Sequence, residues 1–308
     1  MRIHVEQDVY DSFNRAVHLK GISSFEDWIQ VHADRLNEMI VESGMSMRID
    51  NIVVEPNGIL PRGATHAPHD ILWDGRWGFE TDEWCENTCP NKIAYWAMRI
   101  QPSLVHEWAH QLGFAHMYDA NVLPADNAIT GERLNLKNPE VTGGQDDIGI
   151  SAETGIKPPS YILTALASTK DYRRGYYGEY LFDTPENNII RINDLNGAPL
   201  ADAIVIVWQS SNKKISSSSL VLSGTTNNNG ELVLPNQPVH SLTTATGHTL
   251  KPNPFGAISV TGDNGLFLIE ISARGQKYYH VMTIHEFNLA YWKGFRSTAV
   301  YSIATDIE

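Results

Sequence analysis

The segment from His106 to His116 places three histidines and a glutamate at the spacing HExxHxxGxxH. On a helix, residues four apart lie on one face, so His106 and His110 can direct their imidazoles at one metal ion. Glu107 would lie beside that ion and accept a proton from its bound water. Gly113 can adopt a positive φ and turn the chain, so that His116 supplies a third nitrogen. Three protein ligands leave one position open for water, which is the pattern of a catalytic Zn2+ site rather than a structural one.

The residues around this motif favour a helix that is buried on one side. Pro102 and Ser103 suit a first helical turn. The motif histidines fall between apolar positions, so we expect the ligands to face a cleft lined by core residues. Those apolar residues are Leu104, Val105, Trp108, Leu112 and Phe114. Asp119 is an alternative third ligand if His116 points away from the metal.

On these residues the chain resembles the metzincin clan of zinc metallopeptidases. The resemblance implies that His106, His110 and His116 bind Zn2+ and that Glu107 is the general base. It also implies a mixed sheet and an active-site helix in the N-terminal part of the chain. Metzincins are mostly exported, so the resemblance further implies a secreted or cell-surface protein. No signal peptide is visible, and the chain reads as a fragment that begins at the first strand of the catalytic domain.

The Met-turn of the metzincin pattern has no methionine in this sequence. After Met117 the next methionine is Met282, in the C-terminal part of the chain. Ile148 in the segment QDDIG, or Leu163 in the segment SYIL, would take its place as the apolar floor of the site. In some metzincins a tyrosine near this turn stabilises the oxyanion. Four tyrosines are candidates for that role, although packing is the alternative for each: Tyr161, Tyr172, Tyr176 and Tyr177.

Three further segments extend the resemblance to large bacterial secreted proteins in which β-sandwich modules follow a metzincin-like peptidase. They are residues 104–118 (LVHEWAHQLGFAHMY), 172–181 (YRRGYYGEYL) and 287–294 (FNLAYWKG). After about Thr184, helical periodicity disappears and short strand patterns alternate with turns such as Asn196-Gly197. This part resembles transthyretin-like or carboxypeptidase-regulatory-like sandwiches. The sequence therefore predicts an accessory β-domain behind the catalytic one.

Charge and composition exclude several partners. The chain has 308 residues, a formal net charge of −13 and 42% hydrophobic residues. The acidity argues against nucleic acid and anionic membranes as partners, and no stretch reaches a membrane-spanning length. Residues 143–147 (GGQDD) are a candidate calcium loop. The alternative explanation of the chain's acidic composition is that it keeps the protein soluble. Cys85 and Cys89 form either a short local disulfide or two free thiols.

Helix and strand signals precede the motif. Ser24 to Gly44 has apolar residues at helical spacing between a capping serine and a terminating glycine. His32 lies on that apolar stripe, which favours a packed histidine over a ligand. Residues 47–54 predict a strand. Residues 69–77 predict either an edge strand that pairs with an extended substrate or a loop with buried tryptophans.

These observations together predict two domains. Residues 1–184 would form an α+β metzincin-like catalytic domain, and residues 185–308 an all-β immunoglobulin-like sandwich. The predicted function is a zinc-dependent metalloendopeptidase acting on protein or peptide substrates, with a surface or glycan ligand for the sandwich. One alternative is a catalytically degenerate surface-binding or adhesion module on a metzincin scaffold. Another is a zinc hydrolase acting on a non-peptide amide.

Overall fold

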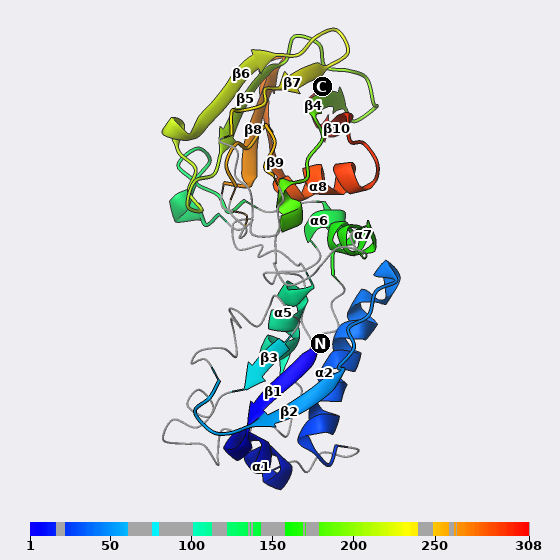
Figure 1. Cartoon of the computed structure of the whole chain (residues 1–308). Helices are drawn as coiled ribbons and strands as arrows, with labels where there is room; N and C mark the ends of the chain where they lie inside the picture. The colour runs from blue at the N-terminus through cyan, green and yellow to red at the C-terminus, as the bar shows by residue number, and fades with distance from the viewer. Residues whose placement is uncertain are drawn as a thin grey trace. The chain divides into compact units, whose positions relative to one another are not determined.

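The computed structural model describes most of the chain in two compact units. The described residues are 1–16, 22–60, 76–79, 101–112, 122–134, 136, 138–142, 158–168, 170, 179–239, 249–258, 262 and 264–307. The first unit contains the elements from β1 to α5, and the second contains the elements from η4 to β10 (Figure 1). Each unit has its own sheets and core, and each is described by itself.

The strands that the structure describes in the first unit form a three-stranded parallel sheet. Strand β1 (Arg2–Glu6) lies in the middle and pairs in parallel with β2 (Asn51–Glu55) and β3 (Arg76–Phe79). Ile3 and Val5 alternate along β1 and are fully buried. The described strands are therefore all parallel, whereas the metzincin resemblance implied a mixed sheet. The predicted strand at 47–54 forms from residue 51 onward, and 69–75 lie outside the described residues.

Helix α1 (Gln7–Ala16) follows β1 directly, and α2 (Phe25–Ile40) carries the main apolar face of the unit. As predicted, the Ser24 side chain caps α2 by accepting a hydrogen bond from the Asp27 amide, 3.1 Å away. The helix passes into a short 3-10 turn, η1 (Val41–Ser43), which ends at Gly44 with φ of 69°. Both predicted end signals of this helix are confirmed.

Aromatic side chains join α2 to the sheet and to α1. The Phe25 ring meets Phe79 of β3 edge-on at 5.4 Å, and Phe13 of α1 packs on Trp28 at 4.8 Å. All four side chains are fully buried. Burying a large aromatic side chain contributes on the order of 2 kcal/mol, so this cluster is a principal source of stability for the first unit.

The second unit contains two sheets (Figure 1). One has the order β10-β4-β7, with β4 (Asn187–Asp194) parallel to β10 (Thr298–Thr305) and antiparallel to β7 (Glu231–Leu234). The other is antiparallel with the order β6-β5-β8-β9. Its strands are β6 (Leu220–Thr225), β5 (Ile204–Gln209), β8 (Leu266–Ala273) and β9 (Gln276–Thr283).

Helices and short 3-10 turns complete the second unit. The helices are α6 (Pro139–Thr142), α7 (Ser160–Ser168) and α8 (Ile284–Trp292), and the 3-10 turns are η4 (Pro124–Asp126), η5 (Glu179–Phe182) and η6 (Ser217–Ser219). Helix α8, which the strand patterns after residue 184 did not predict, lies between β9 and β10 at one end of the sheets (Figure 1). Within the second unit α8 packs against α7.

The core of the second unit brings α8 against both sheets. Phe255 stacks on Phe267 of β8 at 4.1 Å, and Phe287 of α8 meets the Phe255 ring edge-on at 4.7 Å. On its other side Phe287 contacts the Tyr301 ring of β10 at 4.5 Å. Elements α6, α7 and η5 belong to this unit as well.

No helix within the described ranges has both the length and the apolar composition that crossing a membrane requires.

The turn between β6 and β7 requires glycine at residue 230, which yields a matched pair of variants. Gly230 has φ of 70°, and a Cβ there would come within 2.4 Å of the Ile192 carbonyl oxygen. Gly197 has φ of 84°, but a Cβ there would meet nothing within 4 Å. We expect Gly197→Ala to lose about 1 kcal/mol of unfolding free energy from backbone strain alone. Gly230→Ala should lose about 2 kcal/mol more through the clash. Urea denaturation of the full chain measures both, and equal losses would contradict the close approach at Gly230.

Candidate functional site on helix α5

The motif residues that the structure describes lie on helix α5 (Pro102–Gln111). The helix begins at the predicted first turn. Leu104, Val105, Trp108 and Ala109 are buried, whereas His106 and Glu107 are half-buried. His110 follows His106 by one helical turn on the same backbone face. The structure therefore places two of the predicted ligand positions one turn apart on α5, with His106 and Glu107 at the boundary of its buried face.

A buried histidine on α2 holds the start of α5. The backbone amide of Gln101, directly before the helix, donates a 2.7 Å hydrogen bond to His32 Nε2. His32 Nδ1 lies 2.7 Å from the Trp28 carbonyl oxygen, to which it donates in the tautomer that leaves Nε2 as an acceptor. The His32 ring also meets Trp108 of α5 edge-on at 6.4 Å. The prediction that His32 is a packed histidine is confirmed.

Burial keeps His32 neutral. Removal from water lowers the pKa of His32 to about 4, and the hydrogen bond to the Trp28 carbonyl opposes part of that shift. A protonated ring would carry a hydrogen on both nitrogens and could no longer accept the hydrogen bond from Gln101. The position of α5 is therefore coupled to the ionisation of one buried side chain.

Several predicted site residues lie outside the described residues. They are His116, Asp119, Ile148, Cys85, Cys89, Tyr172, Tyr176, Tyr177 and the candidate calcium loop 143–147. Leu163 is described and is buried on α7 in the second unit. Tyr161 is also buried on α7, where its ring stacks on His285 at 4.4 Å, so packing is the role that the structure shows for it.

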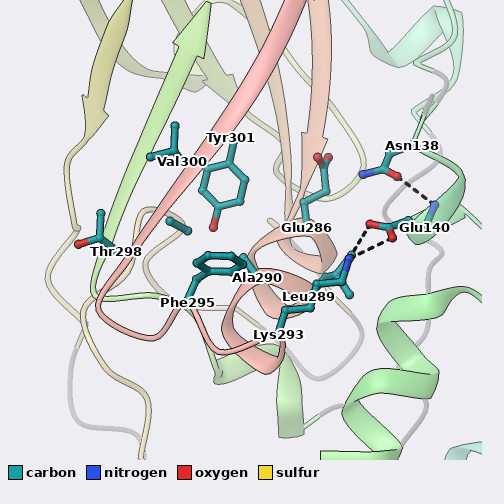
Figure 2. Close-up of a pocket in the computed structure, with 11 residues that line it drawn as sticks. Asn138, Glu140, Glu286, Leu289, Ala290, Lys293, Phe295, Thr298, Val300 and Tyr301 are labelled. Carbon is teal, nitrogen blue, oxygen red and sulfur yellow. Dashed lines mark hydrogen bonds and ion pairs between the residues drawn. The ribbon is translucent and has the colours of Figure 1, made fainter. Parts of the chain in front are cut away.

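A pocket in the second unit is the feature that sequence reasoning missed. It has a volume of about 410 Å³ and lies between α8, the beginning of β10 and the segment that leads into α6 (Figure 2). Lys293 Nζ binds both carboxylate oxygens of Glu140 at 3.0 Å and thereby joins the end of α8 to α6. Burial raises the pKa of Glu286 to about 7, and hydrogen bonds from the Thr283 amide and the Asn138 side chain offset part of the rise.

Comparisons with known proteins add only weak structural likenesses. No protein-family model matches the chain, and no curated protein matches it either. Hydroxyquinol 1,2-dioxygenase from Pseudomonas putida is similar at 14% identity and a TM-score of 0.22, over 40% of this chain and 57% of that one. A 9R-lipoxygenase from Cyanothece is similar at 10% identity and a TM-score of 0.22, over 41% of this chain and 17% of that one. A 3-chlorocatechol 1,2-dioxygenase from Rhodococcus opacus is similar at 13% identity and a TM-score of 0.21, over 40% of this chain and 60% of that one.

These comparisons contradict the predicted identity. The similar structures are two dioxygenases and a lipoxygenase, and none of the three is a metallopeptidase. Within the described residues, no group of three His, Cys, Asp or Glu side chains could hold a metal ion. On these findings four predictions are wrong: a metzincin-clan protein, a zinc metalloendopeptidase, a degenerate module on that scaffold and a Zn2+ cofactor. The TM-scores of 0.22 and 0.21 are too low for these similar structures to assign an activity to this chain.

The physical reason for the correction is the short range of the motif. A spacing of four residues puts two histidines on one face of one helix. A third ligand and the floor of a site must come from other parts of the chain, and spacing alone does not place them.

The buried His32 predicts a loss of stability in mild acid. A histidine whose pKa falls from about 6.5 in the unfolded chain to about 4 in the folded one binds its proton more tightly when unfolded. Its contribution is complete above about pH 6.5 and is lost as the pH falls through about 4, for a total of about 3 kcal/mol. We expect His32→Gln to show a smaller drop in unfolding free energy than the native protein between pH 7 and pH 4.5.

Urea denaturation of the full chain at both pH values makes this comparison. His285, whose pKa burial lowers to about 3, is present in both proteins, so its titration cancels in the difference. An identical drop in the two proteins would contradict the role assigned to His32.

Proposed function

We propose that helix α5 carries a divalent transition-metal site and that the protein functions as a metal-dependent proton-transfer centre. One observation carries the proposal: His106 and His110 lie one turn apart on a described helix, with His106 at the edge of its buried face. Neutral imidazole nitrogens suit divalent transition metals, and two on one helical face form a common half-site. His116 is the proposed third ligand, on the strength of the sequence spacing.

The surroundings of α5 favour a preorganised half-site. Trp108 and Ala109 are fully buried, and the bond between Gln101 and His32 fixes the first turn of the helix. A helix held along one face leaves little freedom for the residues at its edge. His106 is thus positioned before any ion binds, which reduces the entropic cost of binding.

Glu107 is the proposed proton acceptor. It follows His106 on α5 and is half-buried, so its carboxylate lies at the same edge of the buried face. A divalent ion bound at the site would lower the pKa of water and bring it within reach of a carboxylate base. Glu107 would take that proton and hold it in a partly dry environment.

The first prediction concerns stoichiometry and ligands. Purified native protein, loaded with a panel of divalent first-row ions and then desalted, should retain about one ion per chain by mass spectrometry. His106→Ala, His110→Ala and His116→Ala should each weaken retention by at least about a hundredfold, more than the loss of an outer-shell partner. His280→Ala, which removes a half-buried histidine from β9 in the second unit, is the matched control. Absence of bound ion in the native protein would end the proposal.

The second prediction separates the base from the ligands. Glu107→Gln should retain the ion with unchanged stoichiometry, because the amide keeps the size of the side chain and removes only its charge and basicity. In Co2+-loaded protein, the pH midpoint of the visible absorption change should move by about one unit or more when the neighbouring carboxylate is removed. An unchanged midpoint would show that Glu107 does not exchange protons at the site.

A further inference from the structure

The pocket in the second unit has the composition of a small-ligand site. Its volume of about 410 Å³ falls in the range of roughly 300 to 1,000 Å³ that is usual for such sites. It combines an apolar wall with a few polar side chains, which is the usual arrangement for binding with orientation. The site is independent of the metal site proposed on α5.

Polar groups gather on one side of the pocket. In Figure 2, Asn138, Glu140 and Lys293 lie to one side of Glu286. Glu140 and Lys293 neutralise one another through two hydrogen bonds of 3.0 Å. Glu286 is half-buried and accepts a 3.3 Å hydrogen bond from the Thr283 amide, and burial raises its pKa to about 7. The polar side therefore offers hydrogen-bonding groups, and the charges of two of them neutralise one another.

Aromatic and aliphatic groups form the opposite side. Figure 2 shows Phe295, Val300 and Tyr301 on the side of Glu286 away from Glu140. The Phe295 side chain is 57% exposed and Val300 is 41% exposed, although both line the pocket. Tyr301 donates a 2.9 Å hydrogen bond to Asn188 Oδ1, which fixes its ring. An exposed aromatic ring beside a row of hydrogen-bonding groups is an amphipathic surface.

We propose that this pocket binds an uncharged saccharide of one or two sugar units. A sugar ring has an apolar face of C–H groups and a rim of hydroxyls, which matches the ring of Phe295 on one side and the polar groups on the other. Glu286 and Asn138 would exchange hydrogen bonds with the hydroxyls, as Thr298 would at the mouth of the pocket. The ligand would gain contact without bringing in a charge that the pocket cannot pair.

Charged ligands suit the pocket less well. An anion would compete with Glu140 for Lys293 and would lie near Glu286. A cation would have to compete with Lys293 for the carboxylate of Glu140, which already makes two hydrogen bonds of 3.0 Å. Neutral hydroxyls avoid both penalties.

The test is binding of neutral and charged sugars to the full-length protein. A panel of neutral mono- and disaccharides is compared with amino sugars and uronic acids by saturation-transfer NMR, followed by titration for Kd. We expect binding of at least one neutral sugar and weaker binding of its charged analogues. Phe295→Ala should weaken the neutral sugar about tenfold, the effect of one aromatic contact worth about 1.4 kcal/mol.

One control variant guards against indirect effects. Leu220→Ala removes a side chain of similar exposure, 54%, from β6 outside the pocket and should leave Kd unchanged. Failure of every neutral sugar to bind, tighter binding of a charged analogue, or an unchanged Kd in Phe295→Ala would each overturn the proposal.

Discussion

The hydrogen bond from the Gln101 amide to His32 is the constraint on which the candidate metal site depends. It joins residues 69 positions apart and ties the beginning of α5 to the middle of α2. The aromatic cluster around Phe25 and Trp28 packs α2 against the sheet. The neutral His32 ring on α2 then accepts the hydrogen bond that fixes the beginning of α5. A long-range backbone-to-side-chain bond in a dry setting is strong because no water competes for it. This hydrogen bond and the buried face of α5 together hold the half-site.

Local signals in the sequence predicted much of the secondary structure. Ser24 and Gly44 marked the ends of the α2 region because capping and left-handed termination depend on neighbouring residues. Short strands follow residue 184 as the alternating patterns predicted, β7 over residues 231–234 among them. Helix α8 was missed because its residues are largely buried, among them Ile284, Phe287 and Leu289, so no polar stripe marked a helical period. The parallel pairing of β10 with β4 depends on distant residues, and no local pattern encodes it.

The two candidate sites also differ in whether their residues lie close together in the sequence. His106, Glu107 and His110 were found from the sequence because one helical turn contains them. The pocket escaped because its walls come from α6, α8 and β10, whose residues are far apart in the sequence and individually ordinary. The Lys293–Glu140 pair spans 153 positions and has no spacing rule behind it. The prediction of a zinc peptidase was wrong for a related reason. It extended a short local motif to a whole active site, whose other parts come from distant residues.

The position of β10 has a consequence for the order of assembly. Strand β4 pairs with β10 through residues as far apart as Tyr301 and Asn188, which are 113 positions apart and share a hydrogen bond. During synthesis β4 must wait for β10 to leave the ribosome, with only β7 as a neighbour. Parallel partners this distant in sequence form slowly, because a long loop must close first. The pairing of β4 with β10 is therefore a late step in the folding of the second unit.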